Sequence, residues 1–160
     1  MEIRFAQEKD IGGILCLLRQ VGQVHHEIRP DLFRSGAIKY TREELKRILA
    51  DESSPIIVGT EEDKVLGYCF CQIRQYRNST VLTDRKELYI DDLCVDESCR
   101  GRHVGKQLYD HTCAWAKSIG CNFVTLNVWC GNDNAMTFYE KRGLTPRSVT
   151  MEVSLEDTKC

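Results

Sequence analysis

The sequence has no long apolar run and no excess of positive charge. Over its 160 residues, no stretch approaches the roughly 18 apolar residues that span a bilayer, and the first ten, MEIRFAQEKD, lack the apolar core of a secretory signal. The 22 basic and 24 acidic side chains give a formal net charge of −2, so there is no overall cationic field for nucleic acid or acidic membranes. We therefore expect a cytoplasmic protein with no nucleic acid or membrane partner, in which any anion is bound by local groups.

The sequence also lacks internal repeats, low-complexity tracts and linkers. A chain of this length most simply forms one compact domain, large enough to bury a substantial core without disulfide or metal staples. We therefore predict a single domain over residues 1–160.

Cysteine is abundant, but its pattern does not favour disulfides or zinc. The nine cysteines are an odd number and no export signal accompanies them. The close pairs are Cys69 with Cys71, which alternate along one face of a strand, and Cys94 with Cys99, which span a strand end and a loop. Zinc is the other interpretation of these pairs, but we expect no metal and mainly reduced, partly buried cysteines.

Apolar periodicity predicts the order of strands and helices. Strands are expected at residues 2–5, 55–60, 65–75, 87–95 and 122–129, with a last strand in which Val149, Met151, Val153 and Leu155 alternate. Helices are expected over residues 11–21, after the capping box of Thr41 and Glu44, over 104–119 and over 133–142, and HHEIRPDLFRSG is expected to be irregular. This order predicts an α/β (α+β) fold with a mixed, mostly antiparallel sheet of about six to seven strands and helices on both faces.

The strand at residues 87–95 changes phase in its middle. Leu88 and Ile90 are at even-numbered positions, which share one face of a regular strand. The apolar pattern continues at the odd-numbered positions Leu93 and Val95, which would lie on the opposite face. One extra residue near the adjacent acids at positions 91 and 92 would restore the pattern, and such β-bulges recur beside active sites. We predict a bulge here; the alternative is that Leu93 lies on the outer face of the sheet under a helix.

The loop RGRHVGK at residues 100–106 joins this strand to the next helix. Strand, glycine-containing loop and helix N-terminus together favour an anion, because consecutive amides and the helix dipole point at it. Neither G-x-x-x-x-G-K-[ST] nor an early G-x-G-x-x-G is present, which argues against a P-loop nucleotidase and a dinucleotide oxidoreductase. The alternative to a phosphate loop is the start of a helix with solvated cations.

Two motifs in this order resemble the GNAT superfamily of acyl-CoA-dependent N-acetyltransferases. The first is V-x-x-x-x-R-G-x-x-x-G, formed by Val95, Arg100, Gly101 and Gly105, and the second is NDNAMTFYEKRGL, about thirty residues later. The resemblance covers essentially the whole chain. It implies acetyl-CoA as co-substrate, transfer to a primary amine by direct attack in a ternary complex, and it allows a homodimer.

The resemblance also implies which residues bind coenzyme A. Backbone groups of Leu93, Cys94 and Val95 would pair with the pantetheine arm like an added strand. Asn134 and Tyr139 fall where the family commonly contacts the cofactor. His103 replaces the first glycine of the family's loop, which is tolerable if this residue has an ordinary helical backbone, since amides bind phosphates whatever the side chain. The pyrophosphate loop itself falls on Arg100, Gly101, Arg102, His103, Val104 and Gly105, with Lys106 starting the helix.

Transfer to an amine requires a general base, because an alkylamine with a pKa of about 10.4 is neutral in only ~1 part in 2,500 at pH 7. Asp91 best matches the acid that has this role in several family members, and Asp92 and Glu87 are alternatives; any of the three carboxylates could instead be solvated or ion-paired. An amide near Leu93 or Cys94 would stabilise the oxyanion. Tyr139 would assist the departing thiolate, its alternative role being core packing.

Several interpretations stay open at this point. Cys94 or Cys130 could act as a nucleophile, although neither has a histidine at a recognisable triad position. A coenzyme A binding or regulatory module without turnover is the second function class, and a nucleic acid-binding protein is disfavoured by the acidic balance. The acceptor amine is expected to meet HHEIRPDLFRSG, the loop at residues 76–86 and the last hairpin. Surface-loop packing is favoured for each side chain of that segment, the alternative being that they line a pocket: His25, His26, Glu27, Asp31 and Phe33.

Overall fold

Five strands in the order β1-β2-β3-β4-β5 form one sheet in the computed structural model, which describes residues 1–155. The first four strands pair antiparallel, and β5 runs parallel to β4. The mixed, mostly antiparallel sheet predicted from the sequence is therefore confirmed. The strands are β1 (Glu2–Phe5), β2 (Ile56–Glu61), β3 (Lys64–Tyr76), β4 (Arg85–Val95) and β5 (Phe123–Leu126).

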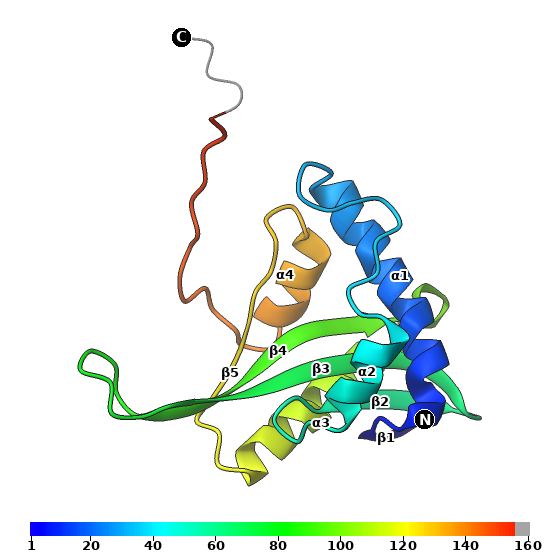
Figure 1. Ribbon diagram of the computed structural model, residues 1–160, viewed down its shortest axis with the longest axis horizontal. Helices are drawn as coiled ribbons and strands as arrows, with labels where there is room; N and C mark the ends of the chain where they lie inside the picture. The colour runs from blue at the N-terminus through cyan, green and yellow to red at the C-terminus, as the bar shows by residue number, and fades with distance from the viewer. Residues whose placement is uncertain (156–160) are drawn as a thin grey trace. The chain divides into compact units, whose positions relative to one another are not determined.

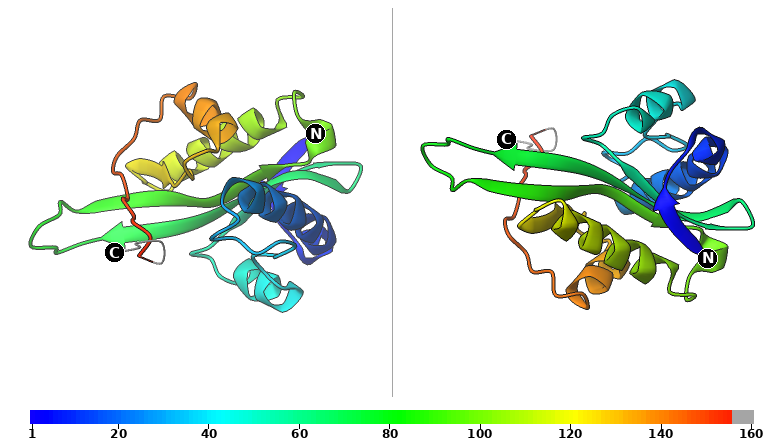
Figure 2. Two further views of the ribbon diagram at one scale, coloured as in Figure 1. Left: turned by 90° about the horizontal axis from the view of Figure 1, so that it is seen from above. Right: turned by 90° about the horizontal axis from the view of Figure 1, so that it is seen from below.

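The chain divides into two units, Met1–Asn127 and Val128–Cys160, shown in Figure 1. The first unit contains the whole sheet, and Figure 2 shows α1 and α2 on one face of it and α3 on the other. The second unit contains α4 and a following extended segment. The helices are α1 (Ile11–Ile28), α2 (Arg42–Leu49), α3 (Val104–Ser118) and α4 (Asp133–Glu140), with short 3₁₀ turns η1 (Glu8–Asp10) and η2 (Glu97–Cys99).

The face of the sheet under α1 and α2 carries the main hydrophobic core. Side chains spaced three or four residues apart on α1 are fully buried, because this spacing places them on one side of a helix. They pack against Tyr68 and Phe70 of β3 and against Leu45 of α2. The capping box predicted for α2 is present: the Thr41 side chain accepts from the Glu44 amide at 3.2 Å, and the Glu44 carboxylate accepts from the Thr41 amide at 2.7 Å.

The hairpin between β2 and β3 turns in two residues. Glu62 and Asp63 have φ angles of 48° and 63°. Two successive positive φ angles are the mark of a type I′ turn, whose twist matches that of the strands it joins. The polar turn EEDK therefore joins β2 and β3 as a hairpin.

On the opposite face, a glycine lets α3 approach the sheet closely. A Cβ atom at Gly67 of β3 would lie 2.8 Å from the carbonyl oxygen of Cys94 and 2.9 Å from Cδ1 of Leu108. Because real Cβ atoms do not approach other atoms so closely, a larger residue would push α3 away from the strands. The contact fixes α3, whose first turn follows the loop RGRHVGK.

Three element predictions differ from the structure. Helix α1 continues to Ile28, so His25 and His26 are helical instead of irregular; Val24 and Ile28 extend its apolar spacing, and it ends just before the residue that precedes Pro30, where helices commonly stop. Strand β5 is shorter than the expected residues 122–129. The last strand is not formed in the described residues, so the sheet has five strands.

The segment expected to form that last strand is extended and solvent-exposed. Its four alternating apolar side chains are 74% to 85% exposed. An alternating pattern predicts two unlike faces, but a strand also requires a neighbour for its backbone hydrogen bonds. The alternating pattern alone was therefore insufficient to predict a strand. These residues are Val149, Met151, Val153 and Leu155.

The cysteines of the described residues are all free thiols. Four are buried, which matches their interpretation as small apolar residues: Cys69, Cys71, Cys94 and Cys99. Cys160 lies outside the described residues. Within residues 1–155, no helix combines the length and the apolar character needed to cross a membrane.

Candidate active site

The predicted β-bulge is present in β4. Phe70 of β3 faces Asp92, while the next residue of β3, Cys71, faces Ile90, so Asp91 is the extra residue of the pair of strands. The phase change read from the sequence is therefore confirmed. A bulge bends the strand and re-aims the side chains beside it, and here two consecutive acids contact residues on the α1–α2 side of the sheet.

The same part of β4 has an open edge within the first unit. β5 pairs with β4 only along Glu87–Ile90, although β4 continues to Val95. Among the described residues of this unit, no strand lies beside residues 91–95 on that side. Extended backbone of this kind can pair with a strand-like ligand. The backbone groups predicted to hold pantetheine, those of Leu93, Cys94 and Val95, belong to this edge.

The loop after β4 leads to the N-terminus of α3, which has no side-chain cap among the described residues. The 3₁₀ turn η2 is followed by Gly101, with φ 78°, and by His103, the N-cap residue of α3. Because the first amides of a helix have no partners within it, and because the dipole favours negative charge, this N-terminus has the geometry for binding an anion.

His103 does not have the ordinary helical backbone that was set as the condition for tolerating it. His103 has φ 62° and ψ 14°, which is the left-handed region. Glycine is favoured there because it has no Cβ atom, and histidine is among the residues that tolerate this region better than most. The conformation explains why the motif usually has glycine at this position. It also leaves the histidine side chain without a capping role.

Two cations of the loop are already paired with acids. Arg102 donates to Glu61 at 2.9 Å and 3.2 Å, and Lys106 donates to Asp110 at 2.6 Å. Arg100 is exposed, and its guanidinium has no ion pair with a described residue. Of the three predicted charges, Arg100 is therefore the one that needs no rearrangement to reach an anion.

The two acids at the bulge have different environments. The Asp91 carboxylate accepts from Lys39 Nζ at 2.7 Å and from the Tyr40 hydroxyl at 2.8 Å, both at Oδ2. Asp92 accepts from the Tyr68 hydroxyl at 2.8 Å. Burial raises the pKa of Asp92, a rise that the hydrogen bond from Tyr68 and the positive charge of Lys39 oppose. The raised pKa suits Asp92 to accept a proton, and Asp91 is the carboxylate that holds a cation.

Other carboxylate and thiol candidates are enclosed. Glu87 is 2% exposed, accepts from the Tyr76 hydroxyl at 3.3 Å and lies 3.5 Å from Arg85. Burial raises the pKa of Cys94 to about 12, and its Sγ lies 3.7 Å from the carbonyl oxygen of Leu17. A Cys94 thiolate is thus disfavoured at neutral pH. Cys130 is exposed and lies in the second unit.

The segment expected to meet the acceptor is organised around Phe33. The His25 and Phe33 rings are 5.0 Å apart, and His26 Nδ1 lies 2.7 Å from the carbonyl oxygen of Phe33. Burial lowers the pKa of His25, which favours its neutral form. Glu27 is exposed and accepts from Gln23 at 2.9 Å, whereas Asp31 is exposed and pairs with Arg29 at 2.6 Å.

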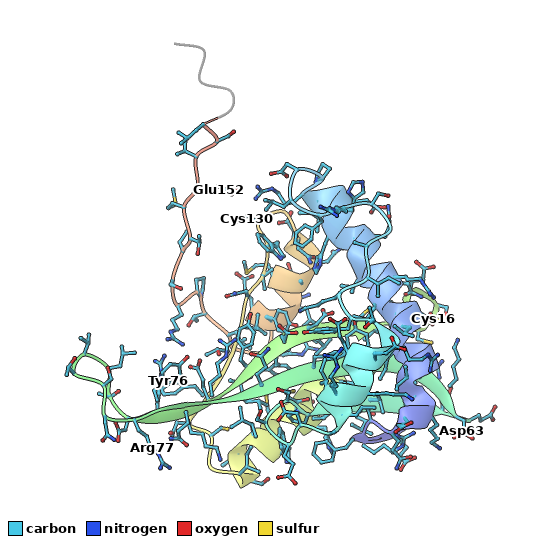
Figure 3. All side chains as sticks on the ribbon, viewed as in Figure 1. Cys16, Asp63, Tyr76, Arg77, Cys130 and Glu152 are labelled. Carbon is cyan, nitrogen blue, oxygen red and sulfur yellow. The ribbon has the colours of Figure 1, made fainter. Side chains whose placement is uncertain are left out.

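The second acceptor-side candidate, the loop that follows β3, lies at the end of the β3–β4 hairpin. Figure 3 labels Tyr76 and Arg77 where this loop begins. Arg85, at the start of β4, lies over the Tyr76 ring at 4.8 Å from its centroid.

Lys39 and Tyr40, which both contact Asp91, were not identified from the sequence. No local pattern indicates their contact with Asp91, because Lys39 precedes it by 52 positions.

Asn134 and Tyr139 lie on α4 in the second unit. This helix is capped by Asn132, whose side chain accepts from the Ala135 amide at 3.2 Å. The Tyr139 ring packs edge-on against Phe138, with centroids 5.0 Å apart. The roles of Asn134 and Tyr139 toward coenzyme A stay predictions.

In residues 1–155, no group of three or more His, Cys, Asp or Glu side chains is arranged to hold a metal ion.

Comparison with known proteins identifies the family of the chain. Residues 21–144 match the Acetyltransferase (GNAT) family. The chain belongs to the GNAT acetyltransferase family. It is 36% identical over 63 residues to glucosamine 6-phosphate N-acetyltransferase of Arabidopsis thaliana, a match that covers 39% of this chain and 40% of that protein. It is 33% identical over 88 residues to an uncharacterized N-acetyltransferase of Lactobacillus delbrueckii, covering 52% and 47%. Each match thus spans less than half of the curated relative.

Solved structures resemble the chain over nearly its full length. A mutant of the BH1408 protein from Bacillus halodurans has a TM-score of 0.92 and 30% identity, covering 97% of this chain and 99% of that one. The aminoglycoside N-acetyltransferase AAC(6')-Iy in complex with CoA has a TM-score of 0.71 and 16% identity, covering 96% and 98%. At that identity the second likeness shows the fold alone. The GNAT fold suggests acyl-CoA binding by this chain.

Proposed function

We propose that this GNAT protein transfers an acetyl group from acetyl-CoA to a primary amine of a small molecule or peptide, by direct attack in a ternary complex. The observation that carries the proposal is the course of β4: a bulge with two acids, then an open strand edge, then uncapped amides at the start of α3. These three features suit an amine, a thioester arm and a pyrophosphate in that order along the chain.

In this proposal the cofactor is held mainly by backbone. The pantetheine arm pairs with Leu93, Cys94 and Val95 as an added strand, and an amide near Leu93 or Cys94 stabilises the oxyanion. The pyrophosphate accepts hydrogen bonds from the loop of residues 100–106 and the first turn of α3. Arg100 adds a charge that the described structure leaves without an acidic partner. Asn134 contributes a further contact to the cofactor.

The amine must lose a proton before it attacks. For an alkylamine at pH 7 the neutral form lies about 4.6 kcal/mol above the ammonium, so the proton needs an acceptor close by. We assign contact with the amine to Asp91, which already binds an ammonium group of the chain. The proton passes to the Asp91–Asp92 pair, in which Asp92 is suited to accept it because burial raises its pKa.

The thiolate of coenzyme A leaves as the new amide forms. Tyr139 is the proposed donor to this sulfur. With ordinary pKa values near 10 for tyrosine and about 8.5 for a thiol, full proton transfer is uphill by ~2 kcal/mol. The hydroxyl therefore assists chiefly through a hydrogen bond, and the thiolate takes its proton from solvent later.

Release of coenzyme A, followed with a thiol reagent, tests the proposal against a panel of primary amines. Amine-dependent release together with the acetylated amine supports transfer. The alternative function, a coenzyme A binding or regulatory module without turnover, predicts acetyl-CoA binding by calorimetry and no release with any amine. Its sequence support, His103, is weakened because the loop keeps the left-handed backbone that glycine would adopt.

We further propose that the chain works as one domain in the cytoplasm and can form a homodimer. The location rests on the near-balanced charge. Sedimentation equilibrium measures the mass in solution directly, and a single species of 18.4 kDa would exclude the homodimer.

A further inference from the structure

An ammonium group of the chain itself lies at the bulge. Lys39 Nζ is 2.7 Å from Oδ2 of Asp91 and 3.3 Å from the carbonyl oxygen of Asp91. The Tyr40 hydroxyl donates to the same Oδ2 at 2.8 Å. A carboxylate, a backbone carbonyl and an oriented tyrosine therefore already form a site that holds a primary alkylammonium.

The two neighbours that contact Asp91 differ in how firmly they are held. The Tyr40 ring is half-buried and stacks on Phe70 at 5.3 Å, and Phe70 in turn packs edge-on against Tyr68 at 4.9 Å. The Lys39 side chain is 42% exposed, whereas that of Asp91 is only 16% exposed. Tyr40 is thus part of the packed core, and Lys39 is a flexible arm that can leave the carboxylate for water.

A partly buried carboxylate whose cation leaves needs a replacement, because an unpaired charge there is costly. The charged and titratable groups that face the bulge are His25 from α1, Lys39 and Tyr40 from the segment before α2, Tyr68 from β3 and Asp92. Burial favours the neutral form of His25, and its pKa is lowered. An incoming ammonium is the group that would replace Lys39 most directly.

We propose that Lys39 is a tethered competitor of the acceptor amine: its ammonium occupies the place at Asp91 that the acceptor's ammonium takes on binding. The inference rests on the proposed acetyl transfer and narrows its substrate class. The acceptor is an aliphatic primary amine on a flexible chain, cationic before it reacts, in preference to an aromatic amine that is neutral at pH 7. Lys39 thereby sets the affinity for the acceptor without contacting the thioester.

Binding of n-butylammonium tests the competition without requiring turnover, because this probe reproduces the end of a lysine side chain. The titration is followed by NMR in coenzyme A-saturated protein, for wild type, Lys39→Met, Lys46→Met and Asp91→Asn. Lys46 is the matched control, since it is 53% exposed on α2 and lies 3.9 Å from Glu8. Thermal unfolding checks that each variant is folded.

We expect Lys39→Met to bind the probe about two- to fivefold more tightly, the factor that corresponds to a partly exposed ion pair. Lys46→Met should bind as wild type does, and Asp91→Asn should lose the binding. With n-butylamine as acceptor, Lys39→Met should lower KM by a similar factor at nearly constant kcat, while KM for aniline should not change.

Equal or weaker binding of the probe by Lys39→Met overturns the inference, as does the same gain in Lys46→Met. Either result would mean that the ion pair of Lys39 with Asp91 is structural and holds the segment before α2 on the sheet. Failure of the proposed function is a separate outcome: tighter binding by Lys39→Met without coenzyme A release from any amine would keep the ammonium site and exclude transfer.

Discussion

His103→Val probes the left-handed backbone at the start of α3. His103 has φ 62° and ψ 14°, a conformation that costs an L residue roughly 1–2 kcal/mol and costs a β-branched residue most. Histidine tolerates it better than valine does. We therefore expect His103→Val to lower the free energy of unfolding by about 1–2 kcal/mol, which for a chain of this size lowers Tm by about 2–4 °C per kcal/mol.

His103→Gly should behave differently. Glycine removes the Cβ strain but gives the unfolded chain more freedom, a cost of about 0.5–1 kcal/mol, so the two effects nearly cancel. Because the amides and not the imidazole are proposed to bind the pyrophosphate, acetyl-CoA affinity should be kept in the glycine variant. The valine variant should bind less tightly, since the loop must leave its conformation.

The assay combines thermal unfolding followed by circular dichroism with calorimetric titration of acetyl-CoA. His111→Val is the matched control, because His111 is exposed within α3 and valine costs only a few tenths of a kcal/mol at such a helical position. The reasoning would be refuted if the valine and glycine variants at position 103 were equally stable. Loss of acetyl-CoA binding in His103→Gly would instead mean that the imidazole contacts the cofactor.

Three further predictions concern the cofactor and the chemistry. Gly105→Glu should abolish acetyl-CoA binding in calorimetry, because it places bulk and negative charge at the first turn of α3; undiminished affinity would mean that the loop is not the pyrophosphate site. Asp92→Asn should lower kcat/KM by about 100- to 10,000-fold and remove the fall in kcat/KM at low pH, which reflects protonation of Asp92. Asp91→Asn should move that fall to lower pH, because the negative charge of Asp91 helps to raise the pKa of Asp92. Tyr139→Phe should lower kcat with little change in acetyl-CoA affinity, and an unchanged kcat would exclude Tyr139 from the reaction.

The sequence predicted the bulge well because strand geometry is strict. Side chains alternate with a period of two, so a change of parity between Ile90 and Leu93 requires an extra residue or a change of face. The capping box at Thr41 was predictable for a similar reason, since it depends on groups only three positions apart. Local rules of this kind correctly located β4, the loop and α3, which together position the proposed cofactor site.

Side-chain partners distant in sequence were not predictable. Nothing near Asp91 indicates that Lys39 and Tyr40 contact it, and the burial that raises the pKa of Asp92 comes from the packing of other elements. The left-handed backbone at His103 was not predicted, because only a helical backbone was considered at this N-cap residue. A histidine at a position where glycine is usual is itself a signal of positive φ, since histidine is enriched in that region.

The bulge gives the adjacent acids Asp91 and Asp92 different proposed roles, and the difference arises from the packing around each carboxylate. In a regular strand, Asp91 and Asp92 would point to opposite faces, one toward α1 and one toward α3. The extra residue allows both to contact the α1–α2 side, where Tyr68 and Tyr40 each donate to one of them. Tyrosine hydroxyls, with an ordinary pKa near 10, are donors at neutral pH, and burial raises the pKa of both tyrosines further. The carboxylate that also meets Lys39 is suited to bind a cation, and the one without that contact is suited to take its proton.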